Sequence, residues 1–463
     1  MIFKIPRTPL LFYLILACLT ISRPRAYCQR RKNFYHLNAG SSRLLRFRYQ
    51  ILPETYHILA CSRPNDQMNS SFSSKLRGFV DGTDVSLPAR IFRTAGLPLS
   101  LLYSFLARIH HLTYDLGFRK SLRVPCVVIS IGNITMGGVG KSPFVAKLAE
   151  ILLAKGKTPG LISRGYKASS HQLQHGSRQA RRTDERYQDY LIFNDEAKEF
   201  TLQFPDVPYF LHPDRGQAAK ALLSYKSEID VIILDDAYQH RKIARDFNVL
   251  IIDALNPFGG RHVAPSGFLR EPLSAIARAD FIILNRADLI SESAKIDIKT
   301  TLRKYAKTNL WGEVCQRPFN IYSINSSDGS QSSSFQAPSI PFSSWKKEFR
   351  RRRILAFCGL GAPKGFQKTL ERENLNVVKF LEFPDHCSYS PQDIQLLSQS
   401  VEQLQIDCLI TTMKDFVKLT ERPTSSLPLY ALEIRAEFVA GEELFLDKID
   451  ALFSSAPTNQ GNA

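Results

Sequence analysis

The sequence predicts an α/β protein, in which a P-loop NTPase-like domain with a parallel sheet is joined to a second, smaller α/β domain. Three observations support this fold class. A glycine-rich loop links an apolar segment to an amphipathic one between residues 127 and 156. Apolar segments then alternate with helical ones up to about residue 288, and a shorter series follows a serine-rich stretch. This alternation is typical of doubly wound parallel sheets.

The glycine-rich loop is predicted to bind nucleotide phosphates. Residues 127–131 have the β-branched composition of a buried parallel strand, and residues 143–154 repeat apolar side chains at helical spacing. Glycines let backbone N–H groups converge on phosphate oxygens, and the helix adds the positive end of its dipole. Lys141 then reaches the terminal phosphates, and Ser142 offers a hydroxyl to Mg²⁺. The loop comprises Thr135, Met136, Gly137, Gly138, Val139, Gly140, Lys141 and Ser142, with threonine at a position usually held by glycine or alanine.

The strand and linker pattern predicts the domain boundaries. We expect strands at residues 127–131, 158–162, 231–234, 249–252 and 281–284, and, in the second domain, at 354–357, 409–411 and 429–432. The predicted parts are a leader (1–85), an amphipathic, membrane-associated helix region (86–123), the P-loop domain (124–320), a serine-rich linker or loop (321–341), the smaller α/β domain (342–453) and a disordered tail (454–463).

Charge and cysteine content exclude some functions and leave the leader open. The net charge is +18, but the first 53 residues contain ten Lys and Arg and no Asp or Glu, so the remainder is only moderately basic and predicts no nucleic-acid partner. The eight cysteines lack the spacing of a zinc site or disulfide framework. The apolar run at residues 10–21 is short for a membrane span. A signal anchor, a transit peptide and a misassigned start all fit the leader.

Residues 86–120 are predicted to form an amphipathic helix with a basic margin. Its apolar stripe consists of Leu101, Leu102, Phe105, Leu106, Ile109 and Leu112. Arginine and lysine residues lie beside this stripe, at positions 90, 93, 108, 119 and 120. Such a helix can lie in an anionic membrane surface, or it can pack on its own domain, and periodicity favours neither.

An acidic pair follows one of the predicted buried strands. Asp235 and Asp236 end the segment "DVIILDD". Carboxyl ends of parallel strands meet at the edge where the phosphate loop lies, so this pair is a candidate for holding Mg²⁺.

Several segments, in order, resemble motifs of the tetraacyldisaccharide 4'-kinase family, which acts in lipid A biosynthesis. They are "SIGNITMGGVGKSP", "LISRGY", "NDEA", "ILDDAYQHRKIARD", "APSGFLREPLSAIARAD", "FPDHCSYSPQD" and "TTMKDFVKL", and the resemblance spans residues 97–432. It implies an ATP- and Mg²⁺-dependent kinase that phosphorylates the 4'-hydroxyl of a lipid A precursor disaccharide 1-phosphate. It also implies the cytoplasmic face of a bacterial inner membrane, with organelle targeting by the leader as the alternative.

The resemblance also implies roles for particular residues. Asp195 matches the family's general base, and His386 matches its partner from the second domain. Arg270 matches a position that neutralises the transferring phosphoryl group, and Lys141 matches the phosphate-loop lysine. Further matched nucleotide-site positions are Tyr166, Arg215, Gln239, His240 and Glu271, and the matched Mg²⁺ ligands are Ser142, Asp235 and Asp236. Asn194 and Ala197 replace the family's usual glycine and proline, which predicts a different base loop.

One rival interpretation is a GTP-dependent switch or metallochaperone. Asn285, Arg286 and Asp288 follow an apolar strand and resemble the guanine-reading Asn-Lys-x-Asp motif, with arginine in place of lysine. The surrounding motifs favour the kinase, and comparing ATP with GTP as the phosphoryl donor separates the two.

Overall fold

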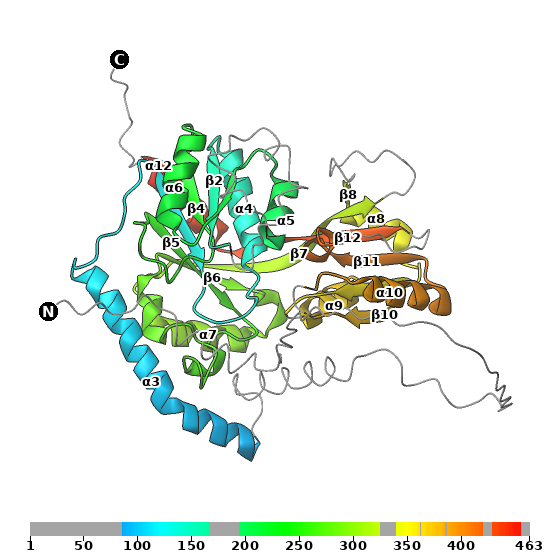
Figure 1. Cartoon of the computed structure of the whole chain (residues 1–463), viewed down its shortest axis with the longest axis horizontal. Coiled ribbons are helices and arrows are strands. Elements are labelled where there is room, and N and C mark those ends of the chain that lie inside the picture. Colours follow the sequence, from blue (N-terminus) through cyan, green and yellow to red (C-terminus); the bar gives the residue numbers. More distant parts are fainter. Residues whose placement is uncertain are drawn as a thin grey trace, which may run out of the picture. The chain divides into compact units, whose positions relative to one another are not determined.

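The computed structural model describes residues 86–165, 194–324, 339–361, 363–384, 387–419 and 428–454. These residues belong to one compact unit, in which strands form a continuous sheet. Figure 1 shows the arrangement of its elements. The predicted leader, Tyr166, His386 and the tail after residue 454 lie outside the described residues.

The first part of the chain forms the P-loop half of the sheet, defined here as strands β1 to β6. Its strands are β1 (Val127–Gly132), β2 (Pro159–Ser163), β3 (Tyr209–Leu211), β4 (Val231–Leu234), β5 (Phe247–Asp253) and β6 (Phe281–Asn285). All pair in parallel, in the order β6-β5-β1-β4-β2-β3. The helices are α3 (Leu87–Asp115), α4 (Lys141–Ala154), α5 (Asp195–Gln203), α6 (Arg215–Tyr225) and α7 (Glu292–Arg303), with 3₁₀ turns η3 (Gly259–Arg261), η4 (Leu273–Arg278) and η5 (Ala287–Leu289).

The second half of the sheet, defined as β9 to β11, is also parallel. It consists of β9 (Ile354–Cys358), β10 (Val377–Glu382) and β11 (Cys408–Thr412), with helices α8 (Phe342–Phe349), α9 (Pro363–Arg372), α10 (Pro391–Leu404) and α11 (Met413–Phe416). Two long antiparallel strands, β7 (Trp311–Ile324) and β12 (Leu429–Ala440), join the halves, and β8 (Ser339–Pro341) pairs with β7.

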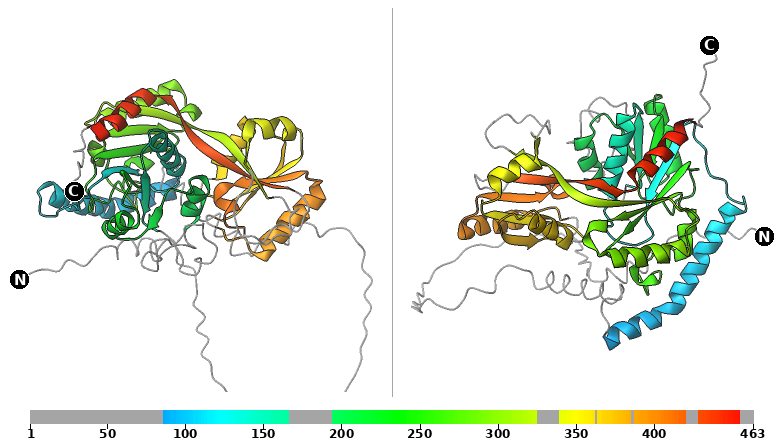
Figure 2. Two further views of the ribbon diagram at one scale, coloured as in Figure 1. Left: turned by 90° about the horizontal axis from the view of Figure 1, so that it is seen from above. Right: turned by 180° about the vertical axis from the view of Figure 1, so that it is seen from behind.

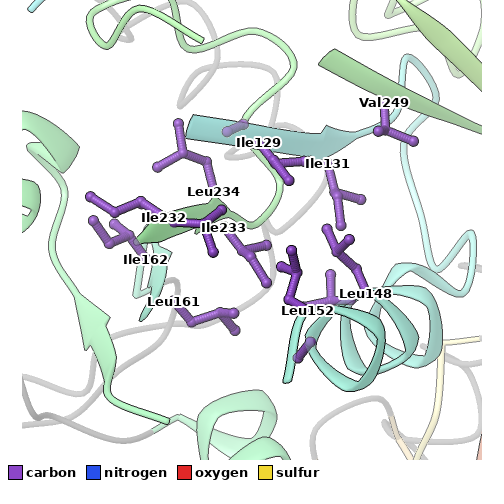
Figure 3. Close-up of a cluster of buried hydrophobic side chains, with 14 of the residues drawn as sticks. Ile129, Ile131, Leu148, Leu152, Leu161, Ile162, Ile232, Ile233, Leu234 and Val249 are labelled. Atoms are coloured by element: carbon purple, nitrogen blue, oxygen red, sulfur yellow. The ribbon is translucent and has the colours of Figure 1, made fainter. Parts of the chain in front are cut away.

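The core of the P-loop half has two layers, because alternate strand residues point to opposite faces. Val249 and Ile251 of β5 pack in one buried cluster with α4, α5 and α6, whereas Leu250 and Ile252 pack in the other with η4 and α7. Figure 3 shows Leu148 and Leu152 of α4 turned toward the strands in the first of these clusters. Burial of these aliphatic side chains holds the phosphate-loop helix against β1.

Two elements cross the predicted domain boundaries. β7 runs without interruption through residue 320, and the last helix, α12 (Glu442–Ser454), returns to the P-loop half (Figure 2). There Phe445 is fully buried and its ring contacts Phe144, Phe247 and Phe281. The segment predicted as the smaller domain (342–453) therefore contributes to both cores. The predicted serine-rich linker (321–341) begins and ends in strands, and its middle lies outside the described residues.

Candidate active site

The phosphate loop connects β1 to α4, as predicted, and its shape depends on glycine. Gly137 and Gly140 have φ angles of 101° and 72°, in the left-handed region that favours glycine. A Cβ atom at Gly140 would also lie only 2.6 Å from Nδ2 of Asn285. Side chains at these two positions would strain the backbone or collide with the groups around it. The loop therefore needs glycine for both its turn and its close packing.

Side chains from neighbouring strand ends hold the loop from outside. Asn285 Nδ2 donates to the carbonyl of Val139 at 2.7 Å. Arg286 Nη2 donates to the carbonyl of Gly138 at 3.0 Å and to Asp253 Oδ2 at 2.7 Å. Because these bonds occupy loop carbonyl oxygens, they help to fix the direction of the loop peptide groups. Thr135 and Met136, at the start of the loop, bond to the segment at residues 268–269.

The residues of the supposed guanine-reading motif have other partners. Asn285 and Arg286 hold the phosphate loop. Asp288, whose carboxylate would have to accept hydrogen bonds from guanine, is ion-paired with Arg372 of α9 and lies 3.7 Å from Nη1 of Arg317. A carboxylate engaged by two guanidinium groups is poorly placed to recognise a base. The structure therefore gives the guanine interpretation no support.

Lys141 is the first residue of α4 and faces the acidic pair. Its Nζ lies 3.3 Å from Asp236 Oδ1 and donates to Asn133 Oδ1 at 3.2 Å. Its side chain is only 14% exposed, so the ammonium group acts where water screens charge weakly. Ser142 follows it in the first turn of the helix. The structure thus places the phosphate-loop lysine within reach of a carboxylate from the end of β4.

The two adjacent aspartates that follow β4 differ in their surroundings. Arg270 Nη1 donates to both carboxylate oxygens of Asp236, at 2.8 and 2.9 Å. Burial by itself would raise the pKa of Asp236, but the Lys141 and Arg270 charges outweigh it and hold the pKa well below its usual range. Asp236 is therefore a permanent anion that organises two cations around the phosphate loop.

Asp235 is buried and has no ion pair with a cation among the described residues. Its Oδ2 accepts a long hydrogen bond of 3.4 Å from the hydroxyl of Tyr209, and its buried Oδ1 has no hydrogen-bond partner in the described part of the chain. Burial, together with the nearby Glu196 carboxylate, raises the pKa of Asp235 to about 6. A buried carboxylate with an open oxygen beside a phosphate loop suits a cation.

Arg215 is buried and bonds the backbone of the acidic pair. Its Nη2 donates to the backbone carbonyls of Asp235 at 3.0 Å and of Asp236 at 2.7 Å, and the residue is 3% exposed. Arg215, which was predicted to lie near the phosphates, therefore shapes the turn after β4 through these two bonds.

Gln239 and His240 lie in the turn after the acidic pair. Gln239 Nε2 donates to the carbonyl of Asn133 at 2.8 Å, which ties this turn to the end of β1. Burial, with the charges of Arg215 and Lys242, lowers the pKa of His240 to about 3, so its imidazole is neutral at neutral pH. Its buried Nε2 has no partner among the described residues, which leaves a neutral ring nitrogen free to bond a ligand.

Glu271 lies apart from this cluster, although it follows Arg270 directly. Its Oε2 pairs with Arg278 Nη2 at 2.5 Å and lies 3.2 Å from His111 Nε2 of α3. The structure therefore connects Glu271 to α3 and η4, and shows no bond from it to the phosphate loop.

Asp195, in the segment "NDEA", is the first residue of α5. Asn194 caps the helix, since its Oδ1 accepts from the N–H of Ala197 at 2.9 Å. The two departures from the family pattern thus form one hydrogen bond, which a proline at position 197 would lack the N–H to make. Lys418, from the turn after α11, brings its Nζ to 3.8 Å from Asp195 Oδ2.

Sequence reasoning missed several residues that shape the site. Asn133 bonds Lys141, and its Nδ2 donates to the hydroxyl of Thr135 at 3.2 Å. Lys414 pairs with Glu196 at 3.1 Å, next to the Asp195 contact. Asn133 lies in the quoted segment "SIGNITMGG", close in sequence to Thr135 and Lys141. The two lysines lie four residues apart in "TTMKDFVKL", but their acidic partners are far away in sequence. For the lysines, the spacing of four residues was the one signal that the sequence offered.

Together, the fold and the site define a P-loop phosphotransferase. A parallel sheet carries a glycine-rich phosphate loop, its lysine faces a carboxylate at the end of a neighbouring strand, and a buried carboxylate with an open oxygen lies beside it. The side-chain contacts of Asn285, Arg286 and Asp288 do not support the guanine-binding interpretation.

Comparisons with known proteins narrow this class to one family. The family model for tetraacyldisaccharide-1-P 4'-kinase matches residues 92–454. Tetraacyldisaccharide 4'-kinase of Halothermothrix orenii is 35% identical over 328 residues, covering 70% of this chain and 82% of the relative. That of Pelobacter propionicus is 33% identical over 356 residues, covering 76% and 90%. A crystal structure of LpxK from Aquifex aeolicus in complex with ATP aligns with a TM-score of 0.57 and 27% identity, over 78% of this chain and 99% of that one.

The chain therefore belongs to the tetraacyldisaccharide 4'-kinase family. The sequence-based assignments of fold class and family are confirmed. The roles assigned to individual site residues stay predictions.

Proposed function

We propose that this chain transfers the γ-phosphate of ATP to the 4'-hydroxyl of a tetraacyldisaccharide 1-phosphate, giving lipid IVA. The observation that carries this proposal is the phosphate-loop lysine facing the carboxylate pair at the end of β4, in a chain of this family. The ATP complex of the Aquifex aeolicus relative supports ATP as the donor.

In the proposed reaction, positive groups gather around the transferring phosphoryl group. Lys141 and Arg270 are already held together by Asp236, so they need little rearrangement to stabilise developing negative charge. The backbone N–H groups at the start of α4 add the positive end of the helix dipole. The site residues thereby supply most of what phosphoryl transfer requires, which is positioning and charge neutralisation.

We propose that Mg²⁺ binds beside the phosphate loop, held by Asp235, by Ser142 and by the phosphates of the nucleotide. Within the described residues no group of three or more His, Cys, Asp or Glu could hold a metal by itself, so the nucleotide phosphates would have to supply ligands. The open Oδ1 of Asp235 fits such an ion better than Asp236, whose two oxygens both accept from Arg270. When bound, Mg²⁺ would neutralise charge on the phosphates.

We propose that Asp195 accepts the proton of the acceptor hydroxyl. It projects from the start of α5. The charges of Lys141 and Asp236 act on its neighbour Glu196, so the start of α5 lies near the phosphate loop. A sugar hydroxyl is a weak nucleophile, so a positioned carboxylate assists its attack. His386, proposed as the partner of Asp195, lies outside the described residues.

We propose that α3 lies against an anionic membrane surface, at the cytoplasmic face of the bacterial inner membrane. Polar bonds dock one side of the helix on the P-loop half: Ser100 Oγ donates to the carbonyl of Val263 at 2.9 Å, and the Tyr103 hydroxyl donates to that of Arg270 at 3.2 Å. The other side exposes the apolar stripe, including Leu101 at 68% and Phe105 at 60%. Within the described residues no helix is long and apolar enough to cross a bilayer. An apolar stripe with basic neighbours suits the membrane interface.

A reconstituted transfer assay tests the kinase proposal. The full chain is incubated with ATP, Mg²⁺ and tetraacyldisaccharide 1-phosphate, and mass spectrometry follows the addition of one phosphoryl group to the lipid. The expected result is a product phosphorylated at the 4'-position, with ATP a better donor than GTP. Lys141→Ala serves as the inactive control. Absence of lipid product, or a clear preference for GTP, would contradict the proposal.

A further inference from the structure

Two lysines from the second half of the sheet contact two neighbouring acids at the start of α5. Lys414 of α11 pairs through Nζ with Glu196 Oε1 at 3.1 Å. Lys418, four residues further on, brings its Nζ to 3.8 Å from Asp195 Oδ2. Both acids belong to the first turn of α5, which packs in the core of the P-loop half through Ala197. The contacts therefore join the candidate base region to the other half of the sheet.

The position of Lys418 is set by the second half and not by Asp195. Its Nζ lies 2.9 Å from Oδ1 of the fully buried Asp415. Asp415 is itself held, because Oδ2 accepts from the N–H of Gly359 at 3.0 Å and from Thr412 Oγ1 at 2.7 Å. The Lys418 side chain is only 8% exposed, and its Nζ lies 5.9 Å from the ring centre of Tyr389. The ammonium group is thus pre-placed, with little freedom to move.

Asp195 is placed independently by its helix. Asn194 caps α5, so the first residue of the helix projects in a defined direction. Among the described residues, the charged groups near Asp195 include Lys418, the neighbouring Lys198 and, beside it, Glu196 with its partner Lys414. Burial lowers the pKa of Lys198, while the Asp195 charge opposes that change. Lys418 is the one of these cations that the second half of the sheet fixes directly against the Asp195 carboxylate.

We propose that Lys418 is a positioning residue for Asp195, and this inference rests on the proposed function of Asp195 as the base. A fixed cation beside a carboxylate favours its ionised form, and only the ionised form can accept a proton. The same contact holds the carboxylate in one orientation. Because the cation comes from the second half of the sheet and the base from the P-loop half, the base is correctly set only when the two halves are together.

Lys414 provides a matched control. It makes the same kind of contact between the same two segments, four residues away, but its partner is Glu196 and not the base. Loss of either lysine removes one charged contact between the two halves. Loss of Lys418 removes the cation that lies 3.8 Å from the Asp195 carboxylate, whereas loss of Lys414 leaves that contact in place.

The experiment measures turnover and KM for ATP and lipid over about pH 4 to about pH 9, for wild type, Lys418→Met, Lys418→Arg and Lys414→Met. For Lys418→Met we expect the acid limb of the turnover profile to move up by about one pH unit, with a loss that grows toward the acid end, to about tenfold at most, and is smaller at high pH. KM for ATP should stay within about twofold. Lys418→Arg should keep the wild-type limb, and Lys414→Met should lower turnover without moving it.

The inference would be overturned if the acid limb of Lys418→Met stayed at its wild-type position, or if the limb of Lys414→Met moved by the same amount. Both lysines would then serve only to hold the two halves together. If Lys418→Met lacks a cooperative thermal transition, Lys418→Gln takes its place with the same criteria. The wild-type assay separates this result from a failure of the proposed function. A wild-type chain that phosphorylates the lipid, together with an unmoved limb, rejects only the role of Lys418.

Discussion

Arg270 donates from a single guanidinium nitrogen to both carboxylate oxygens of Asp236, at 2.8 and 2.9 Å. Asp236 also faces Lys141 at 3.3 Å, so one carboxylate holds the two cations assigned to the transferring phosphoryl group. Asp235, its neighbour in the chain, keeps a buried oxygen without a partner in the described residues. This division between adjacent aspartates underlies the first two predictions.

Replacement of Lys141 by alanine should leave a folded protein with turnover reduced by roughly a thousandfold or more, because a charge that stabilises the transition state is lost. Steady-state assays with ATP and the lipid measure the effect, and circular dichroism checks the fold. Activity within a few-fold of wild type would rule out the phosphate-loop assignment.

Asp235→Asn should stabilise the nucleotide-free protein at neutral pH relative to wild type. Burial raises the pKa of Asp235 from 3.8 to about 6. A raised carboxyl pKa means that its contribution to stability is complete below the unfolded value and is lost as the pH rises through about 6. Asparagine mimics the protonated acid, so the difference in free energy of unfolding between variant and wild type should grow by up to about 3 kcal/mol from about pH 4 to about pH 7.

Urea denaturation without ATP and Mg²⁺ measures that difference, with Asp236→Asn as the control. Asp236 has the opposite displacement of its pKa, so its replacement should destabilise the protein above about pH 4. A pH-independent difference for Asp235→Asn would show that this carboxyl group is not protonated in the folded protein near pH 5. Because Asp235 is the proposed Mg²⁺ ligand, Asp235→Asn should also raise the Mg²⁺ concentration needed for half-maximal turnover.

Asp195→Asn keeps the shape of the side chain but removes a proton acceptor. Turnover should fall by about a hundred- to ten-thousandfold, with little change in ATP affinity. His386→Ala should cost less, and if the two residues act as a unit the double variant should be scarcely worse than Asp195→Asn alone. Turnover and ATP binding by calorimetry measure these effects. Losses that multiply would show that the two residues work independently.

Polar replacements of Leu102, Phe105 and Ile109 should weaken binding to anionic vesicles, because these exposed side chains supply the apolar contact area of α3. Deletion of residues 1–85 should leave vesicle binding and activity largely intact. Vesicle co-sedimentation of both proteins separates the two regions. If the deletion abolishes binding and the replacements do not, α3 is not the membrane contact.

Local patterns were enough to predict much of the fold. β4 was predicted at residues 231–234 and lies there, since four consecutive apolar residues in a doubly wound domain indicate a fully buried parallel strand. β1 and α4 were found to within two residues for the same reason. Four strands were not predicted, because their segments lack a distinctive local period: β3 (Tyr209–Leu211), β7 (Trp311–Ile324), β8 (Ser339–Pro341) and β10 (Val377–Glu382).

The sequence by itself determined the glycine loop, the alternation of strands and helices, and the motifs that mark the family, because each of these depends on residues near one another in the chain. Only the tertiary structure decided which residues meet across long separations: Lys418 with Asp195, Asp288 with Arg372, and Phe445 with the core of the P-loop half. It also decided that Asp236 would be neutralised by Arg270 while Asp235 kept an open oxygen. The two aspartates are adjacent and chemically identical, so their different chemistry arises from burial and from charges that distant segments bring to them.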